Sequence, residues 1–186
     1  MGSSKSANIL MVRYNYEERG QYAVLLKPRT DSRDGERKIQ SRMGLSASAE
    51  YVDEFLKEIS TIWKKENTEY RYQGKKVDAV LVDEAQFLSE AEIDTLSDLV
   101  DFYNIPVICY GLRTDFRNRL FPGSRRLMEI ADVIEEVPTV CWCGKRAQCN
   151  TRYANGEIVR EGAQIMLGSN ESYVALCRKH YKEGKL

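Results

Sequence analysis

VDAVLV, residues 77–82, is a short apolar run broken only by Asp78, and two carboxylates, Asp83 and Glu84, follow it directly. Such a run is typical of a strand that is covered on both faces of a parallel sheet. Ligands bind open α/β sheets at the carboxyl ends of the strands. Two adjacent carboxylates at such an end are costly unless they bind a metal or act on a proton. The stretch predicts a buried strand that ends in a functional site, and a solvated acidic loop is the alternative.

Helical and strand patterns alternate along the first two thirds of the chain. Periodicity and apolar runs predict helices and strands at residues 6–18, 22–26, 52–64, 77–82, 89–100, 106–110 and 124–131. Ser89 and Glu92 have the spacing of a capping box, which marks the start of one of these helices. The polar, basic stretch 27–48 predicts a long functional loop. This alternation predicts an α/β fold with a mainly parallel sheet and flanking helices.

Composition excludes several classes of protein. The 186 residues include 28 Lys+Arg and 28 Asp+Glu, so no excess positive charge is available to hold nucleic acid. No stretch approaches the roughly 20 apolar residues of a membrane helix, and the first ten residues, MGSSKSANIL, do not resemble a secretory signal. Several of the five cysteines are closely spaced, which favours metal ligands in a reducing compartment. We expect a cytoplasmic protein that binds neither nucleic acid nor membranes.

The first six residues, MGSSKS, resemble the end of a phosphate-binding loop. Lys5 and Ser6 match the last two positions of G-x-x-x-x-G-K-[ST], where lysine contacts the β- and γ-phosphates and the hydroxyl contacts Mg²⁺. Ser4 replaces the second glycine, and the first glycine and its preceding strand are absent, so we expect the chain to begin inside its own motif. If residues 1–186 are the whole molecule, we expect it to be poorly stable and to bind ATP weakly. A small polar N-terminal tail is the alternative to a phosphate-binding loop for residues 1–6.

Opposite that loop, the two carboxylates can take different roles. Asp83 is a natural ligand of Mg²⁺ or its water, across from Ser6. Glu84 points the other way and is placed to accept a proton from an attacking hydroxyl group.

The character of the chain changes at Pro138, where we place a boundary between domains 1–137 and 138–186. Asn155-Gly156 predicts a hairpin with a type I′ turn. Cys141 and Cys143 form one pair of candidate ligands, and Cys177 with His180 forms another. Zinc in structural sites takes four such N or S ligands.

Four protein ligands leave no open position, so we expect the zinc to be structural. Cys149 is a competitor for one ligand position, and Cys109, in a predicted strand, is interpreted as a small buried apolar residue. Unligated, reduced cysteines are the alternative. Loss of zinc is expected to raise the substrate KM before it affects the chemical step.

These features together resemble the type II, zinc-containing thymidine kinase family of bacteria. The matching stretches, in family order over nearly the whole chain, are MGSSKS, NYEERGQ, SRMGLS, VLVDEAQFLS, CYGLRTDFRNRLF, GSNESYV and CRKHY. The resemblance implies a P-loop NTPase-like kinase domain followed by a small zinc-knuckle and lasso domain. It implies transfer of the γ-phosphoryl group of ATP to the 5′-hydroxyl of thymidine, giving dTMP and ADP in nucleotide salvage. It also implies a homotetramer and feedback inhibition by dTTP.

The resemblance assigns roles to particular residues. Glu84 corresponds to the base that takes the hydroxyl proton. The positions that correspond to ATP and Mg²⁺ binding are Gly2, Ser3, Ser4, Lys5, Ser6, Asp31, Arg33 and Asp83. The positions that correspond to the thymidine pocket are Met1, Phe87, Leu112, Phe116, Phe121 and, in the lasso loop, Tyr173. For the aromatic residues, an ordinary place in the core is the alternative.

Two other functions remain open from the sequence. The incomplete phosphate loop would suit a nucleotide-binding relative without kinase activity. The second alternative function is that of a zinc-ribbon protein that binds nucleic acid, although residues 138–186 lack the basic, aromatic face that such proteins carry.

Overall fold

A computed structural model describes residues 4–31, 35–62, 69–165 and 173–186 of the chain. The predicted site residues Met1, Gly2, Ser3 and Arg33 lie outside this part. The chain divides into two compact units, an N-terminal unit of residues 4–111 and a C-terminal unit of residues 112–186. This division falls earlier in the chain than the domain boundary expected near residue 138, which stays a prediction.

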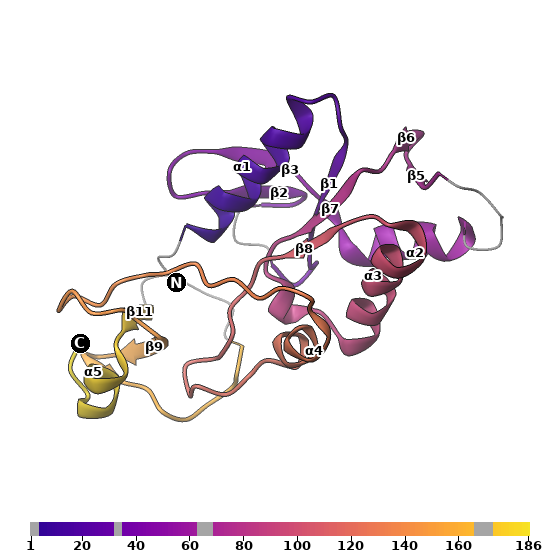
Figure 1. Ribbon diagram of the computed structural model, residues 1–186. Helices are drawn as coiled ribbons and strands as arrows, with labels where there is room; N and C mark the ends of the chain where they lie inside the picture. The colour runs from indigo at the N-terminus through magenta and orange to yellow at the C-terminus, as the bar shows by residue number, and fades with distance from the viewer. Residues whose placement is uncertain (1–3, 32–34, 63–68, 166–172) are drawn as a thin grey trace. The chain divides into compact units, whose positions relative to one another are not determined.

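A four-stranded parallel sheet forms the centre of the N-terminal unit, in the order β4-β1-β7-β8. Figure 1 labels three of these strands, β1, β7 and β8. Its strands are β1 (Ala23–Lys27), β4 (Glu50–Tyr51), β7 (Ala79–Val82) and β8 (Val107–Cys109). Every residue of β1 and β7 is buried, as the continuous apolar runs predict. The predicted α/β fold with a mainly parallel sheet and flanking helices is confirmed.

Helices cover both faces of this sheet. Successive side chains of a strand point to opposite faces. Ile9 and Leu10 of α1 (Lys5–Glu17) pack against one face in a cluster with Leu25 and Leu81. Helix α2 (Val52–Ile62) contacts β4, and α3 (Glu90–Tyr103) contacts β8 and α2, on the other side of the strands (Figure 1). The core of the N-terminal unit therefore lies on both sides of β1 and β7.

Helix α3 begins as the sequence predicts. Ser89 Oγ accepts a hydrogen bond from the backbone N–H of Glu92, and the Glu92 carboxylate accepts one from the backbone N–H of Ser89. The helix ends at Asn104, whose left-handed backbone (φ 53°) closes the last turn. A capping box is a local signal, which explains why the start of the helix can be located from the sequence. The helix continues to Tyr103, beyond the predicted end at residue 100.

The expected long loop of residues 27–48 is only partly irregular, and this expectation was wrong where two strands form. Strands β2 (Lys38–Gln40) and β3 (Ser46–Ser48) pair as an antiparallel hairpin. The side chain of Ile39 is buried in the same cluster as α1, and Ala47 of β3 packs against that cluster, so apolar contacts anchor a segment whose sequence is mostly polar. A second small hairpin joins β5 (Arg71–Tyr72) to β6 (Lys75–Lys76).

The C-terminal unit contains α4, a three-stranded antiparallel sheet and a short last helix. The sheet has the order β10-β9-β11. Its elements are α4 (Pro122–Ile130), β9 (Cys149–Ala154), β10 (Glu157–Ile158), β11 (Tyr173–Leu176) and α5 (Arg178–Glu183). Asn155 and Gly156 both have positive φ (49° and 79°) between β9 and β10, as a type I′ turn requires. The predicted hairpin is confirmed. In the described parts of both units, no helix is long and apolar enough to cross a membrane.

Candidate active site and metal cluster

The carboxylate pair lies where the central strand β7 ends. The backbone N–H of Asp83 donates to the carbonyl of Leu26 (2.9 Å), and that of Ala85 donates to the carbonyl of Tyr110 (2.9 Å). The neighbouring strands β1 and β8 therefore hold the turn from both sides. Asp83 and Glu84 are both buried, with 2% and 8% of their surface exposed. The pair thus lies at the edge of the parallel sheet where ligands bind.

Ser6 and Asp83 meet across this edge. Ser6, in the first turn of α1, donates a hydrogen bond from its hydroxyl to Asp83 Oδ2 (3.1 Å). Asp83 Oδ1 accepts a hydrogen bond from the backbone N–H of Glu84 (2.9 Å). A hydroxyl oxygen beside a carboxylate is the ligand chemistry that Mg²⁺ prefers. The chain therefore places two oxygen ligands suited to Mg²⁺ beside the first turn of a helix.

The electrostatics of the pair favour a cation. Burial, followed by repulsion from the Glu84 carboxylate, raises the pKa of Asp83 from 3.8 to about 6. The Asp31 charge adds to this rise, while hydrogen bonds from the Glu84 N–H and Ser6 oppose it. Since several negative groups meet with little solvent, the ionised form of Asp83 is disfavoured.

A stability prediction follows from this pKa. Because the folded pKa lies above the unfolded one, ionised Asp83 destabilises the fold at neutral pH, and the penalty disappears below about pH 4. A rise of this size corresponds to about 3 kcal/mol. Asp83→Asn should therefore raise the melting temperature of the nucleotide-free, Mg²⁺-free protein at neutral pH, with no gain below about pH 4.

Thermal unfolding at the two pH values measures this effect. Asp101→Asn, an exposed position on α3, is the matched control and should change little. A variant of Asp83 that is less stable than the unmodified protein at neutral pH would contradict the expected electrostatics.

The backbone at Glu84 is unusual for a residue with a side chain. Its φ of 51° and ψ of 35° lie in the left-handed region, and the short helix η1 (Ala85–Phe87) follows. Gln86 Nε2 donates to the Glu84 carboxylate. Left-handed backbone at a non-glycine residue costs about 1–3 kcal/mol and is found preferentially at functional sites. The turn aims a buried carboxylate at the sheet edge at the expense of local stability.

Gly111, after β8, is packed closely against this turn. A Cβ atom there would lie 2.8 Å from Gln86 Oε1 and 3.1 Å from the Gln86 backbone nitrogen. The added methyl group of Gly111→Ala should displace the 84–86 turn, because the backbone nitrogen cannot rotate away. For the predicted role of Glu84 as the base, we expect this variant to lower kcat about 10- to 100-fold, since small displacements of a catalytic group have effects of this size. Steady-state kinetics on folded protein measure it, and an unchanged kcat would show that the turn tolerates the displacement.

Lys27 is a buried residue near the site that the sequence analysis missed. It is fully buried at the end of β1, and its Nζ donates to the carbonyls of Lys38 (3.0 Å) and Gly35 (3.3 Å). Its Nζ also lies 3.8 Å from the carboxylate of Asp31. A lysine that closes an otherwise apolar strand is the signal that could have identified it, because lysine is rarely buried without a partner.

Four potential metal ligands converge in the C-terminal unit. The ligand atoms of Cys141, Cys143, Cys177 and His180 all lie within 4.8 Å of one another. Cys141 and Cys143 lie in a tight turn in which the N–H of Gly144, at φ 81°, donates to the carbonyl of Cys141. Cys177 precedes α5, and His180 lies in that helix's first turn. One turn and one helix start thus each contribute two ligands.

The distances fit a tetrahedral zinc ion. Zinc–sulfur and zinc–nitrogen bonds of about 2.3 and 2.1 Å require S···S and S···N separations of about 3.8 and 3.6 Å. Cys143 Sγ lies 4.0 Å from Cys177 Sγ, and Cys141 Sγ lies 3.3 Å from His180 Nδ1. Burial opposes ionisation of Cys141, but backbone N–H groups and the His180 ring outweigh it and lower the pKa of that thiol to about 6. The cluster is therefore prepared to bind a cation through thiolate.

Two neighbours complete the surroundings of the cluster. The ring of Trp142 stacks on that of His180, with centroids 4.2 Å apart and planes 1° apart. Cys149 is buried in the adjoining core, but its sulfur does not belong to the ligand group. Among the described residues, the group that could hold a metal ion contains the four predicted ligands and not Cys149.

The comparisons with known proteins identify the family. A family model described as thymidine kinase matches residues 1–181. The chain belongs to the thymidine kinase family. Relatives named thymidine kinase include those of Haemophilus influenzae, 45% identical over 184 residues (98% of this chain, 92% of the relative), and Legionella pneumophila, 44% identical over 186 residues (100% and 87%). The relative from Idiomarina loihiensis is 42% identical over 184 residues (98% and 92%).

The residues that the thymidine kinase resemblance assigns to the nucleoside pocket belong to both units. Phe87 is half-buried in the N-terminal unit, after the carboxylate pair. Leu112, Phe116, Phe121 and Tyr173 belong to the C-terminal unit. Phe116 and Phe121 are buried there, with 1% and 5% of their surface exposed. Their roles in binding stay predictions.

Asp115 organises the loop that carries both phenylalanines, and the sequence analysis missed it. Its Oδ1 accepts the backbone N–H groups of Arg117 and Arg119, both at 2.9 Å. Its Oδ2 accepts hydrogen bonds from the Arg117 side chain (3.0 Å) and from Gln164 Nε2 (3.1 Å). Despite burial, these hydrogen bonds hold the pKa of Asp115 below its usual value. An aspartate two residues before a turn is a known local signal, which could have identified it.

Proposed function

We propose that this chain transfers the γ-phosphoryl group of ATP to the 5′-hydroxyl of thymidine, giving dTMP and ADP in nucleotide salvage. The family match over residues 1–181 carries the proposal. The buried carboxylate pair supports it, because phosphoryl transfer requires a base beside a group that holds Mg²⁺.

The chain's own residues have separate tasks in this reaction. Glu84 accepts the proton of the thymidine 5′-hydroxyl while the oxygen of that hydroxyl forms a bond to the γ-phosphorus. The bond between the γ-phosphorus and the β–γ bridging oxygen breaks in the same step, and ADP leaves. Lys5, at the start of α1, binds the phosphates, and Ser6 and Asp83 provide oxygens for Mg²⁺. Bound Mg²⁺ neutralises developing phosphate charge. The buried surroundings of Glu84 strengthen each of these interactions.

The Cys141, Cys143, Cys177 and His180 cluster holds a structural zinc ion in this account. All four positions are protein ligands, so no position is left for substrate. These four residues would hold zinc between the turn at residues 141–144 and the start of α5, and the bound metal would stabilise the core that β9 and β11 share. The metal acts on substrate affinity rather than on the chemical step.

We extend the proposal to regulation and assembly on the family resemblance alone. It implies a homotetramer, inhibition by dTTP and a cytoplasmic location. The described cysteines are all free thiols, which suits a reducing compartment.

A nucleoside panel tests the proposed function. Thymidine, deoxycytidine, deoxyadenosine and deoxyguanosine are incubated with ATP and Mg²⁺, and nucleoside monophosphates are separated and quantified. The proposal expects thymidine to be preferred. Preference for another nucleoside would overturn the substrate assignment, and nucleotide binding without any transfer would favour the non-catalytic relative.

A further inference from the structure

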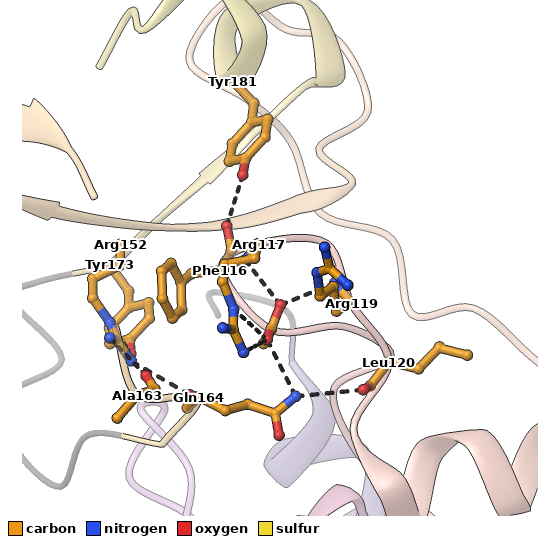
Figure 2. Close-up of polar contacts among 10 residues, drawn as sticks. Phe116, Arg117, Arg119, Leu120, Arg152, Ala163, Gln164, Tyr173 and Tyr181 are labelled. Atoms are coloured by element: carbon orange, nitrogen blue, oxygen red, sulfur yellow. Dashed lines mark hydrogen bonds and ion pairs between the residues drawn. The ribbon is translucent and has the colours of Figure 1, made fainter. Parts of the chain in front are cut away.

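Arg152 of β9 lies at the centre of a network in the C-terminal unit (Figure 2). Its Nε donates to the hydroxyl of Tyr173 (2.7 Å). Its two terminal nitrogens donate to the carbonyls of Ala163 (3.0 Å) and Gln164 (3.4 Å). One side chain therefore joins β9 to the residues on either side of segment 166–172, which lies outside the described residues.

The same guanidinium lies over two aromatic rings. Its central carbon is 3.9 Å from the centroid of Phe116 and 5.3 Å from that of Tyr173. Both rings belong to the set that the proposed function assigns to thymidine. A guanidinium stacks on an aromatic face in a defined orientation, because the group is planar. The position of Arg152 is thus coupled to the positions of both rings.

Stability alone does not explain an arginine at this place. Only 4% of Arg152 is exposed, and no carboxylate lies within ion-pair distance of it in the part of the chain that the structure describes. Burying an unpaired cation is costly, and an apolar side chain of similar volume is often the more stable choice. The carbonyl oxygens and aromatic rings around Arg152 offset that cost only when they are held in their present positions. This indicates that the role of Arg152 is to hold these groups in place.

Gln164 extends the coupling to the loop that holds Phe116. Its Nε2 donates to Asp115 Oδ2 (3.1 Å) and to the carbonyl of Leu120 (3.4 Å). The backbone of the same glutamine is held by Arg152. The 115–120 loop, Gln164 and Tyr173 therefore share one set of hydrogen bonds that converges on Arg152.

We propose that Arg152 is a positioning residue for thymidine, which holds Phe116 and Tyr173 in the geometry that the nucleoside requires. The inference rests on the proposed function. Arg152 acts through the two rings and not on the transferred phosphoryl group. Its removal therefore weakens thymidine binding while leaving the chemical step and ATP binding largely intact.

Arg152→Lys is the first test. Lysine keeps the charge, but its donors are on one nitrogen, whereas Arg152 uses three nitrogens for Tyr173 and the two carbonyls, and an ammonium group cannot stack as a plane. We expect the thymidine KM to rise about 10- to 30-fold, as for loss of hydrogen bonds from a charged group. The ATP KM and kcat should change less than about threefold. Arg146→Lys, an exposed arginine in the same unit, is the matched control.

A double-mutant cycle separates positioning from general destabilisation. Tyr173→Phe removes only the hydroxyl that accepts from Arg152. If Arg152 acts through Tyr173, the double variant should bind thymidine about as weakly as Arg152→Lys alone, because the shared interaction is lost only once. Additive effects on the thymidine KM, or a fall in kcat that follows melting temperature, would overturn the proposal.

The unmodified protein distinguishes this inference from the proposed function. If it phosphorylates thymidine and Arg152→Lys has the same thymidine KM, the positioning role is wrong and the function stands. If the unmodified protein neither binds nor phosphorylates thymidine, the function fails and the inference fails with it. Calorimetric thymidine binding provides the readout that is independent of turnover.

Discussion

Glu84→Gln should lower kcat for thymidine phosphorylation by about 100- to 10,000-fold, the range that a general base contributes. Glutamine has nearly the same shape and keeps an oxygen to accept from Gln86, but it cannot take a proton at neutral pH. The KM values for thymidine and ATP should change little, because the substituted group acts on the proton and not on the bound ground state.

Two controls make this test specific. Glu90→Gln alters an exposed glutamate at the start of α3, six positions along the chain, and should leave kcat within about twofold. Zinc content and melting temperature of Glu84→Gln should match those of the unmodified protein or exceed them slightly. A folded variant with full activity would remove Glu84 from the mechanism.

The second large effect is expected from the metal cluster. Cys177→Ser should abolish stoichiometric zinc binding, since Cys177 is one of four ligands that meet within 4.8 Å. Structural zinc contributes on the order of 10 kcal/mol in small zinc-binding peptides. That exceeds what the small core of Cys141, Ala147, Leu176 and Tyr181 can replace. The variant should melt at a much lower temperature, and its thymidine KM should rise about tenfold or more before kcat falls.

Metal analysis and thermal unfolding measure this prediction together. Cys149→Ala is the matched control, because Cys149 is buried in the same core without belonging to the ligand group. It should retain about one zinc ion per chain. Full zinc content and an unchanged melting temperature in Cys177→Ser would show that the cluster does not hold the metal as described.

Local signals explain which parts of the fold the sequence predicts well. The apolar run 77–82 and the capping box at Ser89 depend on neighbours in the chain, and both are confirmed. The hairpin of β2 and β3 could not be predicted in the same way. It depends on the burial of Ile39 against α1, which is a contact distant in sequence.

The residues of the candidate site also divide into those with a local sequence signal and those that depend on contacts distant in sequence. Motif spacing predicts Ser6, Asp83 and the cysteine pairs as site residues. In the structure, Ser6 lies within hydrogen-bond distance of Asp83, and the ligand atoms of the cysteine pairs lie close together. Arg152 was missed because its partner Tyr173 lies far along the chain, so no local spacing marks this arginine and only the folded structure reveals it. Asp115 bonds to the distant Gln164 as well, but its bonds to the backbone N–H groups of Arg117 and Arg119 follow a local aspartate pattern that is present in the sequence.

Transfer of labelled phosphate tests the central claim most directly. The zinc-loaded protein is incubated with ATP labelled at the γ-phosphate, Mg²⁺ and thymidine, and the products are separated. We predict that the label appears in thymidine 5′-monophosphate in amounts equal to the ADP formed, and only when thymidine is present. A folded, zinc-loaded protein that forms ADP without labelled thymidine monophosphate, or forms neither product, would contradict the assignment.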